Sequence, residues 1–110
     1  MKLKSDEEKA FDQLLGKILK SRREELKLSQ EFISCHSGVS RITIGKWESG
    51  EKTPISFDLY NVLKILYKSP SEFWNTMHQQ CEAVLLPIHA AAEKSKYLNY
   101  IEQTRKRKRL

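Results

Sequence analysis

Apolar residues recur at helical spacing along most of the chain. Residues three and four positions apart share one face of an α-helix, so a stripe of this kind is expected to pack in a core. Such stripes cover Ser5–Leu26, Leu59–Leu66 and the region after Ser69. The first contains Phe11, Leu14, Leu15, Ile18, Leu19 and Leu26, and the second contains Leu59, Val62, Leu63 and Leu66. The pattern therefore predicts an all-α chain.

Residues 29–50 predict two short helices joined by a tight turn. Ser29 is a good N-cap for a helix of about residues 30–37, and Gly38 suits the left-handed conformation that ends it. Ser40 then caps a second helix, from 41 to about 49, whose Ile44 and Trp47 share the inner face. A helix held in this way across a turn fits the major groove of DNA.

The outer face of this second helix carries Arg41, Ile42, Gly45 and Lys46. An arginine can donate two hydrogen bonds to guanine, a lysine can reach guanine or phosphate, and an isoleucine can pack on a thymine methyl group. We therefore expect a half-site that contains G with a neighbouring T. Two interpretations of Gly45 are open. It allows the backbone to approach the duplex closely, or it is tolerated drift, that is, a substitution without a functional role.

The same stretch resembles the helix-turn-helix of the Cro/C1-type (XRE-like) family. The resemblance rests on Ser29-Gln30-Glu31, Gly38-Val39-Ser40, Thr43-Ile44 and Trp47-Glu48-Ser49-Gly50, with matching flanks from about Leu15 to Trp74. It implies a lambda-repressor-like bundle of about five helices. It also implies that Gln30 contacts the DNA backbone, that Arg41, Ile42 and Lys46 contact bases, that Ser40 and Thr43 hold phosphates, and that Arg23 pairs with Glu48.

The chain departs from this family after Trp74. We expect a DNA-binding domain at 1–74, a helical extension at 75–104 and a tail at 105–110. Pro87 is expected to break or kink the extension near Leu86, and Ile88, Ala91, Ser95, Leu98 and Ile101 mark a further helix. These stripes either fold back on the same domain or form a two-fold interface. The second reading suits palindromic sites one helical turn apart, so we expect a homodimer.

The formal net charge of +6 is unevenly distributed. Residues 1–74 contain 13 basic and 11 acidic residues, whereas Arg105 to Arg109 are all basic. DNA binding must then depend on where the cations of the domain lie, because its overall field is weak. The tail is expected to be disordered. It either follows the phosphate backbone or serves only as a solvated end.

The residue inventory indicates neither an enzyme nor a metal protein. It lacks a phosphate-binding loop, a His-Glu-x-x-His motif and a nucleophile elbow, and Cys35 and Cys81 lack partners at zinc spacing. We expect no cofactor, no metal and no small-molecule ligand. The charged N-terminus does not resemble a signal peptide and no apolar run could span a bilayer, so a cytoplasmic protein without a membrane partner is expected.

These observations predict a sequence-specific transcriptional regulator that binds double-stranded DNA as a homodimer on a palindromic operator. Control of its own or neighbouring genes is expected, as in phage-type repressors and the controller proteins of restriction–modification systems. The alternative is an antitoxin or adaptor whose C-terminal helices bind another protein.

Overall fold

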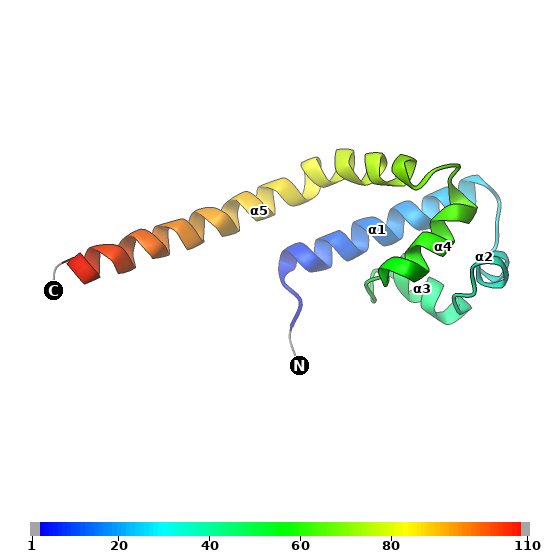
Figure 1. The fold of residues 1–110 in the computed structure, drawn as a ribbon, viewed down its shortest axis with the longest axis horizontal. Helices are drawn as coiled ribbons and strands as arrows, with labels where there is room; N and C mark the ends of the chain where they lie inside the picture. Colours follow the sequence, from blue (N-terminus) through cyan, green and yellow to red (C-terminus); the bar gives the residue numbers. More distant parts are fainter. Residues whose placement is uncertain (1–2, 109–110) are drawn as a thin grey trace.

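The computed structural model describes residues 3–108, without the side chains of residues 85, 86, 88, 89, 92 and 108. This range contains five helices and no strand: α1 (Asp6–Glu25), α2 (Gln30–Ser37), α3 (Arg41–Ser49), α4 (Ser56–Leu66) and α5 (Pro70–Lys108). The all-α prediction is confirmed. The molecule is elongated, with extents of 65 × 30 × 19 Å, because α5 runs far beyond the bundle formed by the other helices (Figure 1).

Serine side chains begin the first three helices, including the two that the sequence analysis assigned to Ser29 and Ser40. The hydroxyls of Ser5, Ser29 and Ser40 each accept a hydrogen bond from the backbone N–H three residues later, at 3.0–3.1 Å. Gly38 and Gly50 end α2 and α3 with φ values of 78° and 82°. A side chain at such angles would be strained, so glycine fixes both helix ends.

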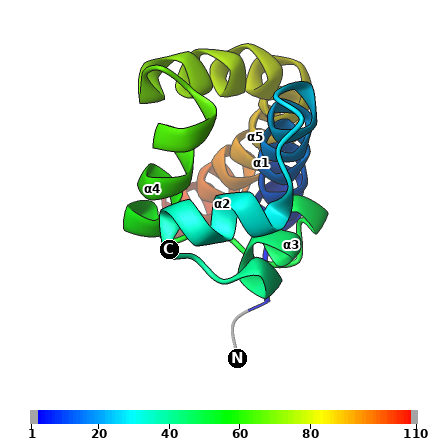
Figure 2. The ribbon, with the colours of Figure 1, turned by 90° about the vertical axis from the view of Figure 1, so that its right-hand side faces the viewer.

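One hydrophobic core holds the bundle together. Viewed from the end of the molecule, α4, the first turns of α5, α1 and the α2–α3 pair enclose it (Figure 2). Most of the predicted apolar positions are buried, whereas Phe11 is only partly buried and Leu26 lies on the surface. The buried members are Leu14, Leu15, Ile18, Leu19, Ile33, Val39, Ile44, Trp47, Leu59, Val62, Leu63, Leu66, Phe73 and Met77.

The backbones of α1 and α3 touch at Gly16. A Cβ atom at this position would lie 2.1 Å from the carbonyl oxygen of Trp47 and 2.8 Å from that of Glu48. Only glycine fits there, because a side chain would push the two helices apart. This contact, which the sequence analysis did not anticipate, sets the distance of α3 from α1.

A buried carboxylate fixes the turn that follows α3. Asp12 is only 3% exposed and accepts hydrogen bonds from Lys4 Nζ at 2.6 Å and from Thr53 Oγ1 at 2.8 Å. Buried carboxylates are stable only when they are paired in this way. The interaction joins the N-terminal segment and the α3–α4 turn to α1.

Pro87 was expected to break or kink the helix near Leu86. The break is wrong, because α5 continues through Pro87 to Lys108, whereas the kink stays a prediction. Proline removes one backbone hydrogen bond, and on this exposed part of α5 water can solvate the freed carbonyl. The core reaches Met77, with Cys81 packed against it, so the bundle extends beyond Trp74. None of the following residues whose exposure is described is buried.

The expected disorder of the tail is also wrong for residues 105–108, which are the last residues of α5. Lys106 lies 3.6 Å from Glu102 one turn earlier, and cations are favourable near a helix C-terminus. Arg109 and Leu110 lie outside the described residues. Within residues 3–108, no helix has both the length and the apolar character that crossing a bilayer requires.

We predict that Gly16→Ala lowers the free energy of unfolding by about 1–3 kcal/mol or more, because the new methyl group overlaps the α3 backbone. Urea denaturation followed by circular dichroism measures this change. Gly45→Ala is the matched control. A Cβ at residue 45 meets nothing closer than 3.9 Å, so alanine should stabilise the helix by about 0.5–1 kcal/mol. Equal effects of the two variants would contradict the assigned contact.

Candidate nucleic-acid interface

The core holds α3 by one face and leaves the other accessible. Ile44 and Trp47 are 2% and 1% exposed, whereas the side chain of Arg41 is 63% exposed and Ile42 is 73% exposed. Lys46 is also exposed. The structure therefore brings Arg41, Ile42 and Lys46 together on the outer face of one helix, where the sequence placed them.

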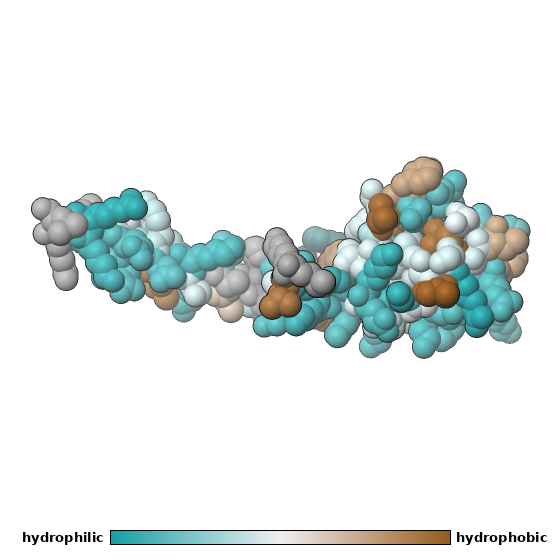
Figure 3. Space-filling model, turned by 90° about the horizontal axis from the view of Figure 1, so that it is seen from below, coloured by the Kyte–Doolittle hydropathy of each residue, from teal (hydrophilic) through white to brown (hydrophobic). Residues whose placement is uncertain are grey.

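The side of the bundle on which α3 lies has a mixed surface. Figure 3 views the molecule from this side, and hydrophilic residues alternate there with residues of intermediate hydropathy and separate apolar patches. A polar surface with isolated apolar contacts suits a duplex, whose groove offers hydrogen-bonding base edges and thymine methyl groups.

Ser40 and Thr43 lie at the start of α3. The Ser40 hydroxyl donates to Thr43 Oγ1 at 2.8 Å and accepts from the Thr43 backbone N–H at 3.1 Å. Ser40 is exposed and Thr43 is half-buried. The pair stabilises the helix N-terminus, which carries partial positive charge and favours phosphate nearby.

Arg41 has a neighbour that the sequence analysis did not identify. Its Nη1 lies 3.5 Å from Oε1 of Glu31, which comes from the first turn of α2. Both side chains are more than 60% exposed. An exposed ion pair at this distance contributes little stability, so Arg41 can leave Glu31 for a stronger bidentate partner.

Gln30 is placed differently from the other predicted residues. It is half-buried, and its Nε2 donates a hydrogen bond at 3.1 Å to Oε1 of Glu48. Its amide also lies against the outside of α3, 3.9 Å from where a Cβ of Gly45 would be. Gln30 therefore connects α2 to α3, and one of its two side-chain amide hydrogens is already used within the protein.

Glu48 is held more strongly by Arg23 of α1, and this predicted pairing is confirmed. Arg23 Nε and Nη2 donate to the two Glu48 oxygens at 2.8 and 2.9 Å, with side-chain exposures of only 13% and 6%. The hydrogen bonds to Glu48 raise the pKa of Arg23 although burial opposes this. Arg23 Nη1 also donates to the carbonyl oxygen of Leu28 at 2.8 Å. One guanidinium thus joins α1, α3 and the segment leading into α2.

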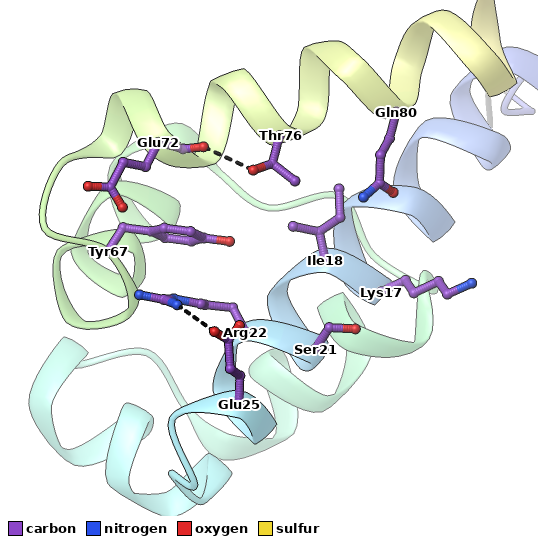
Figure 4. Close-up of a pocket in the computed structure, with 9 residues that line it drawn as sticks. All are labelled: Lys17, Ile18, Ser21, Arg22, Glu25, Tyr67, Glu72, Thr76 and Gln80. Atoms are coloured by element: carbon purple, nitrogen blue, oxygen red, sulfur yellow. Dashed lines mark hydrogen bonds and ion pairs between the residues drawn. The ribbon is translucent and has the colours of Figure 1, made fainter.

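A second candidate site is an open hollow of about 380 Å³ between α1 and α5 (Figure 4). Its most constrained group is Arg22, whose Nε donates to the Leu66 carbonyl at the end of α4 and whose guanidinium lies over the Tyr67 ring, 5.0 Å from its centroid. Nη1 of Arg22 also pairs with Glu25 at 3.2 Å. Burial raises the pKa of Tyr67, which keeps its hydroxyl neutral. These groups satisfy one another, so we assign the hollow a role in holding α4 and α5 on α1.

The cysteines and carboxylates do not form a further site in the described part of the chain. Residues 3–108 contain no cluster of three or more His, Cys, Asp or Glu side chains that could hold a metal ion. Cys35 is exposed on α2, and burial against the core raises the pKa of the Cys81 thiol on α5.

A capped pair of short helices, packed on α1 and presenting the outer face of the second, defines a helix-turn-helix protein. The sequence pattern of the helix-turn-helix family matches residues 19–73, half of the chain. The chain belongs to this Cro/C1-type family.

The chain is also similar to repressor protein C2 of Salmonella phage P22. The two are 36% identical over 58 residues, which are 53% of this chain and 27% of the phage protein. The chain thus matches about a quarter of the length of that repressor.

We predict that Arg23→Gln lowers the free energy of unfolding by about 3–5 kcal/mol, because it leaves the nearly buried Glu48 carboxylate without its cation. Chemical denaturation at neutral pH measures the loss. Glu25→Gln is the control, since Glu25 forms an exposed pair with Arg22 and its removal should change stability by less than about 1 kcal/mol. A loss at Arg23 as small as the loss at Glu25 would show that the pair does not brace α3.

Proposed function

We propose that this protein is a sequence-specific transcriptional regulator that binds double-stranded DNA through α3. The observation that carries the proposal is the outer face of α3, where Arg41, Ile42 and Lys46 are exposed together while Ile44 and Trp47 anchor the helix. A rigidly held helix with outward hydrogen-bond donors at its first turns fits the major groove.

Each residue of the surface has a part in this proposal. Arg41 donates to O6 and N7 of a guanine, Ile42 packs on a thymine methyl group, and Lys46 contacts a base or a phosphate. Ser40 and Thr43 lie against phosphates at the α3 N-terminus, where backbone N–H groups add to the attraction. Gln30 supplies a backbone contact with the remaining donor of its amide.

The regulator acts as a homodimer on a palindromic operator, with residues 75–104 contributing the dimer contact. Two-fold symmetry in the protein matches two-fold symmetry in the operator, and two copies double the phosphate contacts of a bundle whose own net charge is small. Its targets are its own or neighbouring genes, as for a phage-type repressor or a restriction–modification controller. Similarity to a phage repressor supports this class.

A second function is favoured by one observation, the exposure of Val84, Tyr97, Leu98 and Tyr100 along α5. In an antitoxin or adaptor, these residues would bind another protein and DNA binding would be secondary. Sedimentation of the purified chain separates the two functions. A regulator that pairs with itself sediments as a dimer, whereas an adaptor remains a monomer until its partner is added.

We predict that Arg41→Ala removes about 1–3 kcal/mol of discrimination at one base pair of the operator and leaves the preference at other positions unchanged. Duplexes selected from a random pool, followed by mobility-shift titrations with each base pair varied, provide the measurement. Lys64→Ala, on the exposed surface of α4, is the control and should retain full discrimination. An Arg41→Ala protein with the parental base preference would refute the base contact.

Gly45→Ala separates the two readings of this glycine. The protein itself has room for the methyl group, so a loss of stability is not expected. If the α3 backbone approaches the duplex closely, the new methyl group should overlap the DNA at a cost of about 1–3 kcal/mol. We then expect binding to the selected operator to be about 5- to 150-fold weaker with the fold intact. Unchanged affinity in the same titration would identify Gly45 as tolerated drift.

A further inference from the structure

One carboxylate is exposed on the surface that we propose to face DNA. Residues 29–50 contain two acidic residues, Glu31 and Glu48. The Glu48 side chain is 6% exposed and is bound by Arg23, whereas the Glu31 side chain is 74% exposed. A negative charge beside the phosphates of a duplex weakens binding unless it has another role. The presence of Glu31 on this surface is therefore not explained by the proposed contacts.

Glu31 supplies a counter-charge for Arg41. Its Oε1 lies 3.5 Å from Nη1 of Arg41, so the contact joins the first turn of α2 to the first residue of α3. The first turn of α3 contains no acidic residue, and the partial positive charge of a helix N-terminus disfavours a cation there. Without Glu31, the Arg41 guanidinium would be drawn more strongly to the phosphates.

The contact uses one nitrogen of the guanidinium and leaves the other two free. Among residues 3–108, no acceptor is bound to Nε or Nη2 of Arg41. These two nitrogens form a parallel pair of donors that matches O6 and N7 of guanine. Arg23 already combines two such contacts, because its Nε and Nη2 bind Glu48 while its Nη1 donates to the Leu28 carbonyl oxygen. Binding of guanine therefore does not require Arg41 to leave Glu31.

We propose that Glu31 is a positioning residue for sequence recognition, which keeps Nη1 of Arg41 while Nε and Nη2 bind a guanine. The proposal rests on the Arg41 base contact of the proposed function and adds the residue that orients it. The ion pair is weak in water, but the duplex displaces part of the water around it. The attraction between the two charges increases as the effective dielectric constant falls, so the pair persists in the complex.

Holding Arg41 in this way favours the correct operator over other sequences. On the operator, an oriented guanidinium loses little rotamer freedom when it binds guanine. On a duplex without that guanine, Arg41 gains a phosphate contact only by giving up Glu31. The same contact supports the correct complex and weakens incorrect ones, and a difference of this kind is what specificity requires.

A double-variant cycle on the full chain tests this role. The measured quantity is the ratio between the affinity for the selected operator and the affinity for the same duplex with the base pair of Arg41 replaced. Glu31→Gln should lower this ratio about three- to tenfold, which corresponds to the loss of one exposed ion pair and of one ordered side chain. In the Arg41→Ala background, the same substitution should change the ratio by less than about twofold. Mobility-shift titrations provide the affinities.

Glu51→Gln is the matched control, because it removes the same charge from an exposed residue that follows α3 and does not contact Arg41. The ratio should stay within about twofold of the parental value. Salt titrations on a random duplex give a second readout, since a freed Arg41 binds a phosphate. Glu31→Gln should steepen the slope of log affinity against log salt by about one in the parental protein and leave it nearly unchanged in the Arg41→Ala background. Circular dichroism verifies the fold of each variant.

Two results overturn the inference and leave the proposed function standing. If Glu31→Gln binds the operator more tightly with an unchanged or larger ratio, Glu31 only competes with DNA for Arg41. If the ratio falls equally in the Arg41→Ala background, the effect does not pass through Arg41. A parental chain that selects no sequence refutes the proposed function and, with it, the inference.

Discussion

The position of α3 depends on the close contact between its backbone and Gly16 of α1. Because the two helices touch without an intervening side chain, they cannot move closer together without a steric clash. Arg23 then fixes the end of α3 through Glu48, and Ser40 fixes its start. The backbone under the outer face of α3 is therefore held rigidly. A surface whose backbone is held at both ends loses little conformational freedom when it binds a rigid duplex.

Much of the bundle could be predicted from local sequence signals. Serine caps, the left-handed Gly38 and the spacing of Leu14, Ile18, Ile44 and Trp47 are each dictated by residues close in the chain, and the structure confirms them. The pairing of Arg23 with Glu48 joins residues 25 positions apart and came only from the family resemblance. Gly16 and Asp12 were missed because their roles depend on which helices meet, and no local pattern records that.

The errors concern the C-terminal third, where packing does not constrain the chain. Pro87 was expected to break or kink the helix, and the break did not occur, because proline ends a helix only when the lost hydrogen bond or the displaced carbonyl cannot be accommodated. On an exposed helix both can be. Likewise, the run of cations after Thr104 was interpreted as disordered from its composition, whereas residues 105–108 extend an existing helix whose negative C-terminal dipole favours them. In both cases the expectation came from the local residues alone and did not consider that an existing helix can continue through them.

The core that holds α3 ends at Met77, with Cys81 at its edge, and none of the residues of α5 beyond Cys81 whose exposure is described is buried in it. Substitutions in that part of α5 can therefore accumulate without disturbing the outer face of α3. One helix-turn-helix bundle of this design can thus carry C-terminal segments of different sequence while the outer face of α3 stays the same.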